Sequence, residues 1–178
     1  MDEYSINSID SLLNQDNTDV EFFTLNGHIC KAKVESVYDG DTIICIFPYN
    51  NKLWKWHVRL NGLDTPEITL KSGITELEKQ AGLCVKNFLT KIINNKIVTL
   101  HCGHFDKYGR LLADILINNN QNINELLINK KYAHTYHGQT KTTWFENELH
   151  FIIRDYEVQT EIENKRSSTS DSDSDFDW

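Results

Sequence analysis

Three short segments of this sequence combine carboxylates with arginine side chains. They are Asp-Gly-Asp-Thr at 39–42, an Arg-x-x-x-x-Asp-Thr-Pro-Glu segment at 59–67, and Asp-Lys-Tyr-Gly-Arg at 106–110. Carboxylates can hold a hard divalent cation or handle a proton. A pair of guanidinium groups can bind a phosphate and stabilise the charge that develops on it. Together these are the functional groups that hydrolysis of a phosphodiester requires.

Each segment taken alone is compatible with an ordinary turn. Gly40 permits a tight bend, and Gly109 suits a turn position that needs an unusual φ. Pro66 holds the residue before it extended, so that Asp64 and Glu67 can point at a common centre. A hairpin turn, an exposed acidic loop and a second hairpin would explain the three segments equally well one by one. Their order within one short chain favours a common site.

The elements that must position these segments begin with three strands. Apolar and polar residues alternate at 28–37 and again at 53–60, and a short apolar run at 42–48 ends at Pro48. Because turn residues separate these runs, we predict an antiparallel meander. The segments 39–42 and 59–67 then lie at strand ends.

The period changes after the meander. Apolar residues at i, i+3 and i+4 predict a helix over 76–93. Strands are expected at 96–105 and 110–117, on either side of the 106–110 turn. A short helix suits 123–128, and a closing helix suits 143–157 with Trp144, Leu149, Ile152 and Ile153 inward. This order predicts a β-barrel with helices (α+β), namely a five-stranded OB-fold barrel with about three helices.

The charge is unevenly distributed along the chain. The net charge is −8, but 1–21 and 167–178 hold ten of the 26 acids and no Lys or Arg. Residues 22–166 therefore carry 18 bases against 16 acids. We expect an acidic flexible segment at 1–21, a folded domain at 22–160 and an acidic disordered tail at 161–178.

The sequence also indicates where in the cell the protein is expected. No apolar run approaches the roughly 18 residues of a membrane span, and the acidic start differs from a secretory signal. We expect an intracellular, cytoplasmic monomer with no membrane partner, and a nuclear location stays open. The four cysteines form no CxxC pair and lie in apolar runs, which favours reduced thiols, although disulfides stay open.

Other residue groups offer weaker alternatives. The run His101-Cys102-Gly103-His104 contains zinc-ligand types, but it lacks a second ligand pair and a strand would place neighbours on opposite faces. Trp54 and Trp56 share a strand face and could stack bases, although half-buried sheet residues have the same pattern. His134 and His137 are expected to face solvent and are given no role.

In order and spacing, the three segments resemble the staphylococcal nuclease-like (thermonuclease) family over roughly 28–157. The Arg-x-x-x-x-Asp-Thr-Pro-Glu string is the most specific part of this resemblance. It implies a five-stranded OB-type barrel with three helices. It also implies Ca²⁺-dependent endonucleolytic hydrolysis of DNA, RNA or both, leaving 3′-phosphate ends.

The resemblance also implies roles for individual residues. Asp41, Asp64 and the backbone carbonyl of Thr65 match the protein ligands of one Ca²⁺, and Glu67 matches the proposed general base. Arg59 and Arg110 match the two arginines on the scissile phosphate. The residues that line the nucleotide end of the site match Asp106, Lys107, Tyr108 and Tyr136. The alternative is a non-catalytic OB-fold module that binds nucleic acid or a protein partner. Such a module would be free to lose these carboxylates and arginines, and this sequence retains them.

Overall fold

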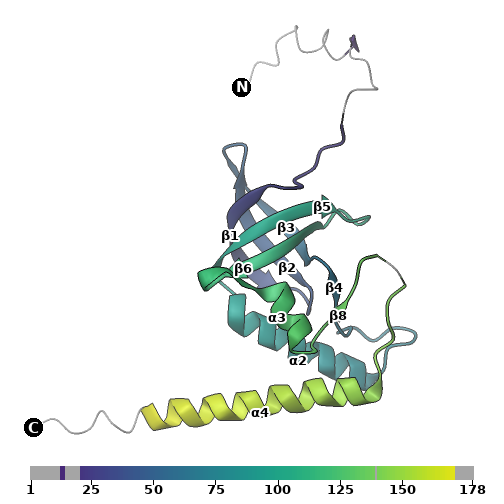
Figure 1. Ribbon diagram of the computed structural model, residues 1–178, viewed down its shortest axis with the longest axis vertical. Helices are drawn as coiled ribbons and strands as arrows, with labels where there is room; N and C mark the ends of the chain where they lie inside the picture. The colour runs from purple at the N-terminus through teal and green to yellow at the C-terminus, as the bar shows by residue number, and fades with distance from the viewer. Residues whose placement is uncertain (1–12, 15–20, 139, 171–178) are drawn as a thin grey trace, which may run out of the picture.

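Five strands form a closed barrel in the computed structural model, which describes residues 13–14, 21–138 and 140–170. The barrel strands are β1 (Ile29–Val37), β2 (Thr42–Tyr49), β3 (Lys52–Leu60), β5 (Ile97–Phe105) and β6 (Leu111–Ile117). Their order is β3-β2-β1-β5-β6, and a parallel pairing of β3 with β6 closes the barrel. All other barrel pairs are antiparallel (Figure 1).

Alternation of side chains explains why these segments form strands. In β1, Ala32 and Val34 are buried, whereas Lys31 is exposed on the opposite face. The register places Val34 opposite Cys45 of β2, so apolar side chains from neighbouring strands meet inside the barrel. Bulges in β1 and β5 increase the local bend that a small closed barrel needs.

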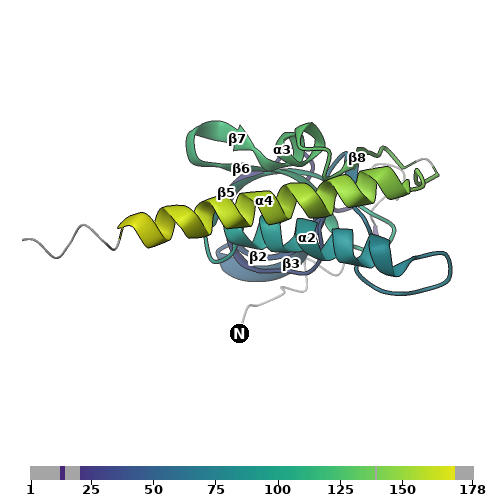
Figure 2. The same ribbon diagram turned by 90° about the horizontal axis from the view of Figure 1, so that it is seen from below.

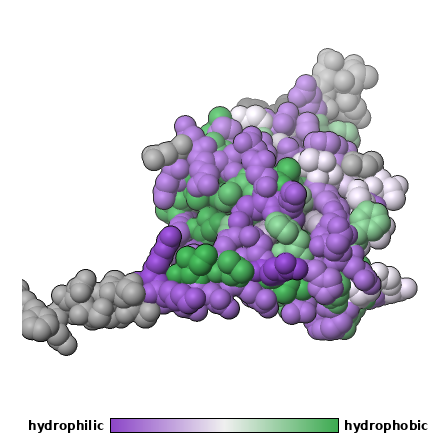
Figure 3. Space-filling view, turned by 60° about the horizontal axis from the view of Figure 1, so that its bottom comes forward, coloured by the Kyte–Doolittle hydropathy of each residue, from purple (hydrophilic) through white to green (hydrophobic). Residues whose placement is uncertain are grey.

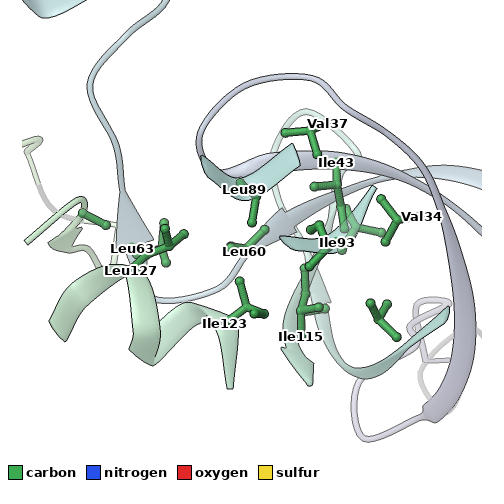
Figure 4. Close-up of a cluster of buried hydrophobic side chains, with 14 of the residues drawn as sticks. Val34, Val37, Ile43, Leu60, Leu63, Leu89, Ile93, Ile115, Ile123 and Leu127 are labelled. Atoms are coloured by element: carbon green, nitrogen blue, oxygen red, sulfur yellow. The ribbon is translucent and has the colours of Figure 1, made fainter. Parts of the chain in front are cut away.

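Three helices pack on one end of the barrel. Helix α2 (Glu76–Ile93) begins at Thr75, whose side chain accepts a hydrogen bond from the Glu78 amide at 3.1 Å. Its apolar face, including Leu89 and Ile93, joins the barrel core (Figure 4). Helices α3 (Ile123–Asn129) and α4 (Glu146–Ser170) complete the set, and α4 runs alongside α2 (Figure 2). The predicted five-stranded OB-type barrel with three helices is therefore confirmed.

Short elements connect these larger ones. Strand β4 (Leu63–Asp64) pairs antiparallel with β8 (His134–Thr135) in a separate two-stranded sheet. A 3₁₀ turn, η2 (Asn118–Asn120), leads into β7 (Gln121–Asn122), which pairs with β6. The β4–β8 pairing matters most for the site, because it joins two chain segments that are far apart in sequence.

Helix α4 differs from its prediction at both ends. Trp144 is buried as expected but precedes the helix, which begins at Glu146 and continues to Ser170 rather than ending at residue 157. An ion pair between Glu163 and Lys91 of α2 supports this extension. The sequence of this polar segment does not indicate that α2 would lie beside it. The helix therefore crosses the expected tail boundary at 161, and the division of the chain into domains stays a prediction.

The extension of α4 leaves apolar surface uncovered. Val158 and Ile162 are 48% and 45% exposed, and apolar surface is visible where α4 leaves the body (Figure 3). In the described part of the chain, no helix has both the length and the apolar character needed to cross a bilayer. All four cysteines are free thiols. Of the segments predicted to be flexible or disordered, 1–21 lies almost entirely outside the described ranges, and so does the 171–178 part of 161–178.

Candidate active site

The fold brings the three sequence segments to one open pocket. The 38–41 turn joins β1 to β2, residues 59–67 run out of β3 through β4, and the 106–110 turn joins β5 to β6. With the chain after β8, they line a cavity of about 850 Å³. Nine of the ten predicted site residues line it: Asp41, Arg59, Thr65, Glu67, Asp106, Lys107, Tyr108, Arg110 and Tyr136. The tenth, Asp64, is only 4% exposed, and ion pairs connect it to lining residues.

Arg59 lies at the centre of a buried ion-pair network. One terminal nitrogen of its guanidinium pairs with Asp41. The other donates to Asp64 Oδ1 at 3.2 Å and to the carbonyl oxygen of Leu63 at 3.0 Å. The planar guanidinium can therefore bridge two carboxylates, one from the 38–41 turn and one from β4. Asp41 and Asp64 thus meet at one guanidinium group.

Burial dominates the electrostatics of Asp41. Loss of solvation raises the pKa of its carboxyl group to about 6, and nearby Asp39 and Asp64 act in the same direction. Arg59 and a 2.8 Å hydrogen bond from the Thr42 hydroxyl oppose this rise. For Arg59, burial acts to lower the pKa, but its pairs with Asp41 and Asp64 hold it above the usual value. Such a site favours a further positive charge beside the aspartates.

Glu67 is held by two lysines. Its Oε1 accepts hydrogen bonds from Lys71 and Lys141, with each Nζ at 3.1 Å. Partial burial acts to raise the pKa of Glu67, but the two ammonium groups lower it overall. Lys141 Nζ also lies 2.7 Å from Asp64 Oδ1. The Glu67 carboxyl group is therefore ionised at neutral pH and is linked through Lys141 to the aspartate pair.

Two glycines let neighbouring elements pack against the 64–67 bend. A Cβ atom at Gly40 would lie 2.5 Å from Thr65 Oγ1. A Cβ atom at Gly82 of α2 would lie 2.6 Å from the Pro66 carbonyl oxygen and 2.8 Å from that of Glu67. Close approach, and not an unusual φ, is therefore what requires glycine at 40. The bend is positioned between the 38–41 turn and helix α2.

The 106–110 turn is organised by its aspartate. Asp106 Oδ1 accepts the backbone amides of Tyr108 at 2.8 Å and Arg110 at 3.0 Å, and Oδ2 accepts Arg110 Nε at 2.7 Å. Burial acts to raise the pKa of Asp106, but these hydrogen bonds lower it overall. Gly109 has φ +78°, as the sequence predicted. Asp106 thus fixes the turn and the orientation of Arg110.

Two tyrosines flank the arginines. The ring centroid of Tyr136 lies 5.8 Å from the guanidinium carbon of Arg59, and that of Tyr108 lies 5.4 Å from Arg110. The Tyr136 amide donates to the Gly62 carbonyl at 2.9 Å next to the β4–β8 pair, which fixes its place at the pocket. Tyr108 is 71% exposed, so its ring is accessible to a planar ligand.

The donor set suits a hard cation. Asp41, Asp64 and Thr65 offer carboxylate and carbonyl oxygens, which are the ligand atoms that Ca²⁺ prefers. All three residues are buried, and the aspartates contact Arg59 and Lys141, so positive charge already lies beside them. Within the described ranges, no three His, Cys, Asp or Glu side chains are grouped so as to hold a metal ion. A cation here would depend on two carboxylates, the carbonyl and non-protein ligands.

Sequence reasoning missed the two lysines. Lys71 lies four residues after Glu67, and this spacing could have indicated the contact. Lys141 is 74 residues from Glu67 in sequence and belongs to no motif, so no local signal points to it. Asp39, which was noted only as part of its turn, accepts the Asp41 amide at 3.1 Å and lines the pocket.

The weaker alternatives also have clear outcomes in the structure. Cys102 points into the core while His101 and His104 are exposed, so the zinc-like run is divided between two faces. Trp56 is partly buried against Phe105 and donates to the Gly109 carbonyl at 2.8 Å, which supports the turn. The expectation that His134 faces solvent is wrong. It stacks on Trp144 at 3.7 Å between centroids and lies 2.9 Å from Glu148, because β8 turns it toward α4.

The barrel and its pocket define an OB-type fold with a carboxylate–arginine site. A model of the family described as staphylococcal nuclease homologue matches residues 57–157, which is more than half of the chain. The chain belongs to this family. Residues 39–42 lie outside the matched range, so the place of Asp41 in the site rests on the geometry.

Two relatives are similar in sequence. An uncharacterized protein of Methanocaldococcus jannaschii is 38% identical over 125 residues, which covers 59% of this chain and 58% of that protein. An uncharacterized 38.1 kDa protein of Capnoides sempervirens is 34% identical over 87 residues, covering 49% of this chain and 23% of the relative. The chain thus spans little more than half of the first relative and about a quarter of the second. Neither name states an activity.

Proposed function

We propose that this protein is a Ca²⁺-dependent endonuclease that hydrolyses phosphodiester bonds in DNA, RNA or both and leaves 3′-phosphate ends. The observation that carries the proposal is that side chains from three separate segments meet at one site. Carboxylates and arginines from the 39–42, 59–67 and 106–110 segments meet at one pocket, although they are up to 71 residues apart in the chain. A cavity of about 850 Å³ is in the range of small-molecule sites and can admit a nucleotide. Membership of the nuclease family supports the same reaction class.

In this proposal the buried oxygens have a defined use. Asp41, Asp64 and the Thr65 carbonyl would hold one Ca²⁺, which supplies charge neutralisation for the phosphate when it is bound. Arg59 keeps both aspartates ionised and oriented, because its guanidinium pairs with each of them. Arg59 also lines the pocket, where it would contact the phosphate.

Glu67 is proposed to act on the attacking water. Its lowered pKa keeps it ionised, so it can orient a water molecule and accept a proton from it. The water oxygen forms a bond to phosphorus and gives a proton to Glu67, while the bond from phosphorus to the 5′-oxygen breaks. The leaving 5′-oxygen takes a proton from solvent water and becomes a hydroxyl group. Arg110, fixed by Asp106, supplies bidentate contact to the phosphate oxygens as their charge grows.

A cleavage assay with matched variants tests the proposal. Full-length protein is incubated with single-stranded DNA and with RNA, in calcium or in chelator. Glu67→Gln and Asp41→Asn should each reduce cleavage by about 100-fold or more, and chelator should abolish it. Glu76→Gln, the same change at an exposed position on α2, should cleave normally. Cleavage that ignores the chelator, or persists in Glu67→Gln, would contradict the mechanism.

One observation favours a second function. The site carboxylates already contact cationic groups of the same chain, as a stable non-catalytic module would require. A non-catalytic OB-fold protein that binds nucleic acid or a protein partner is therefore the alternative. It predicts that wild type and Glu67→Gln retain single-stranded DNA equally and that neither cleaves it. Cleavage by the wild type but not by Glu67→Gln would favour the endonuclease over this alternative.

A further inference from the structure

Lys141 connects an exposed loop to the buried carboxylates of the site. Its Nζ lies 2.7 Å from Asp64 Oδ1 and 3.1 Å from Glu67 Oε1. The lysine side chain is 49% exposed, whereas the Asp64 side chain is 6% exposed. A half-exposed ammonium group thus reaches in from the surface to two carboxylates of the 64–67 bend.

The loop that carries Lys141 is anchored at its two ends. Tyr136 is held at the start by the Gly62 carbonyl and by Arg59. Trp144 is buried at the end. The residues at 140–143 are exposed, so the lysine contact draws the middle of the loop to the body.

Lys141 and a cation at this site would share the carboxylate of Asp64. Calcium binds protein oxygens at about 2.3–2.6 Å. The ammonium nitrogen of Lys141 lies 2.7 Å from Asp64 Oδ1, which is close to this distance. The positive charge of Lys141 also repels a divalent cation at the site, which raises the free energy of the bound ion. The two cations therefore compete for Asp64.

Of the two positive side chains at Asp64, Lys141 is the one that can leave. Arg59 is buried and also donates to the Leu63 carbonyl at 3.0 Å, so its displacement would expose unpaired groups inside the protein. Lys141 is half-exposed and can exchange its carboxylate partners for water at small cost.

We propose that Lys141 is an internal competitor for the cation, which lowers the calcium affinity of the site and is displaced when calcium binds. This inference rests on the proposed function, because it assumes the cation site at Asp41 and Asp64. By linkage, calcium binding then releases residues 140–143 from the body. An ordinary cation site would instead tighten the chain around it.

Calcium titration of lysine variants tests the inference. Calcium chloride is titrated calorimetrically into the full chain carrying Lys141→Met, Lys141→Arg or Lys71→Met. Lys141→Met should bind calcium about five- to tenfold more tightly than wild type, which corresponds to a partly exposed ion pair. Lys141→Arg should stay close to wild type. Lys71→Met is the matched control, because Lys71 contacts Glu67 and should change affinity less.

The outcomes separate this inference from the proposed function. Equal calcium affinities for wild type and Lys141→Met, or equal gains in Lys141→Met and Lys71→Met, would overturn the role of Lys141 and leave the cation site standing. Absence of calcium binding in every variant would overturn the cation site and this inference together. Amide hydrogen exchange gives a second measurement. Exchange at 140–143 should rise when calcium is added to wild type, and a fall would contradict displacement.

Discussion

Ionisation of a buried carboxyl group in the site lowers the stability of the folded protein. Asp41 is buried beside two other acidic side chains, and burial raises its pKa to about 6 from an ordinary value of 3.8. The native state therefore binds a proton at this group more readily than the unfolded state does. Since the folded pKa lies above the unfolded one, stability falls as pH rises between the two values.

The pH dependence of unfolding measures this cost. Between pH 4 and pH 7, in chelator, wild type should lose about 2–3 kcal/mol of unfolding free energy relative to Asp41→Asn. The reason is that only the wild type must ionise a buried carboxyl group at position 41 across this range. Urea unfolding at several pH values gives the two curves. Parallel curves would show that the group keeps an ordinary pKa in the folded protein.

At the scale of elements, helix α2 sets the position of the acidic bend. Gly82 lets the helix backbone approach the Pro66 and Glu67 carbonyls, where a methyl group would lie within 2.6 and 2.8 Å of them. Gly82→Ala should displace the bend and lower cleavage by about tenfold or more. Stability should also fall despite the better helix propensity of alanine. Leu83→Ala, on the exposed side of the same helix, is the control for cleavage rate.

Either of two results would contradict this role for Gly82. One is normal cleavage by Gly82→Ala, and the other is an equal loss in Leu83→Ala. The second would show that α2 affects the site through its general stability and not through this contact.

Elements with a clear period were predictable from the sequence, and elements that depend on distant partners were not. The spacing of Ala81, Val85 and Leu89 predicted α2 with its observed limits of 76–93. The polar stretch after residue 157 has no such period, and α4 persists there beside α2 with the Lys91–Glu163 ion pair. Lys141 was missed for the same reason, because its partners Asp64 and Glu67 are distant from it in sequence.

For the whole molecule, the charge at the chain ends should oppose nucleic-acid binding. Residues 171–178, outside the described ranges, hold four aspartates and no base. Replacing all four by asparagine should raise affinity for single-stranded DNA several-fold at about 50 mM salt, because one polyanion no longer repels another. The gain should vanish near 0.5 M salt, where screening is strong.

Fluorescence anisotropy in the Glu67→Gln background measures this binding without cleavage. A variant with the serines of 171–178 changed to asparagine is the control, since its charge is unchanged. Unchanged affinity after removal of the four aspartates at low salt would show that the end of the chain does not reach the pocket.

The pairing of β4 with β8 has a consequence for synthesis of the protein. Asp41, Asp64 and Glu67 leave the ribosome well before Tyr136 and the strand that pairs with β4. Non-local contacts of this kind form late, because they need both segments to be present. A nascent chain thus contains the acidic residues before the segment after β8, which completes the lining of the pocket, has been synthesised. As the nuclease proposed above, the growing polypeptide would stay inactive toward the messenger RNA beside it until Tyr136 had left the ribosome.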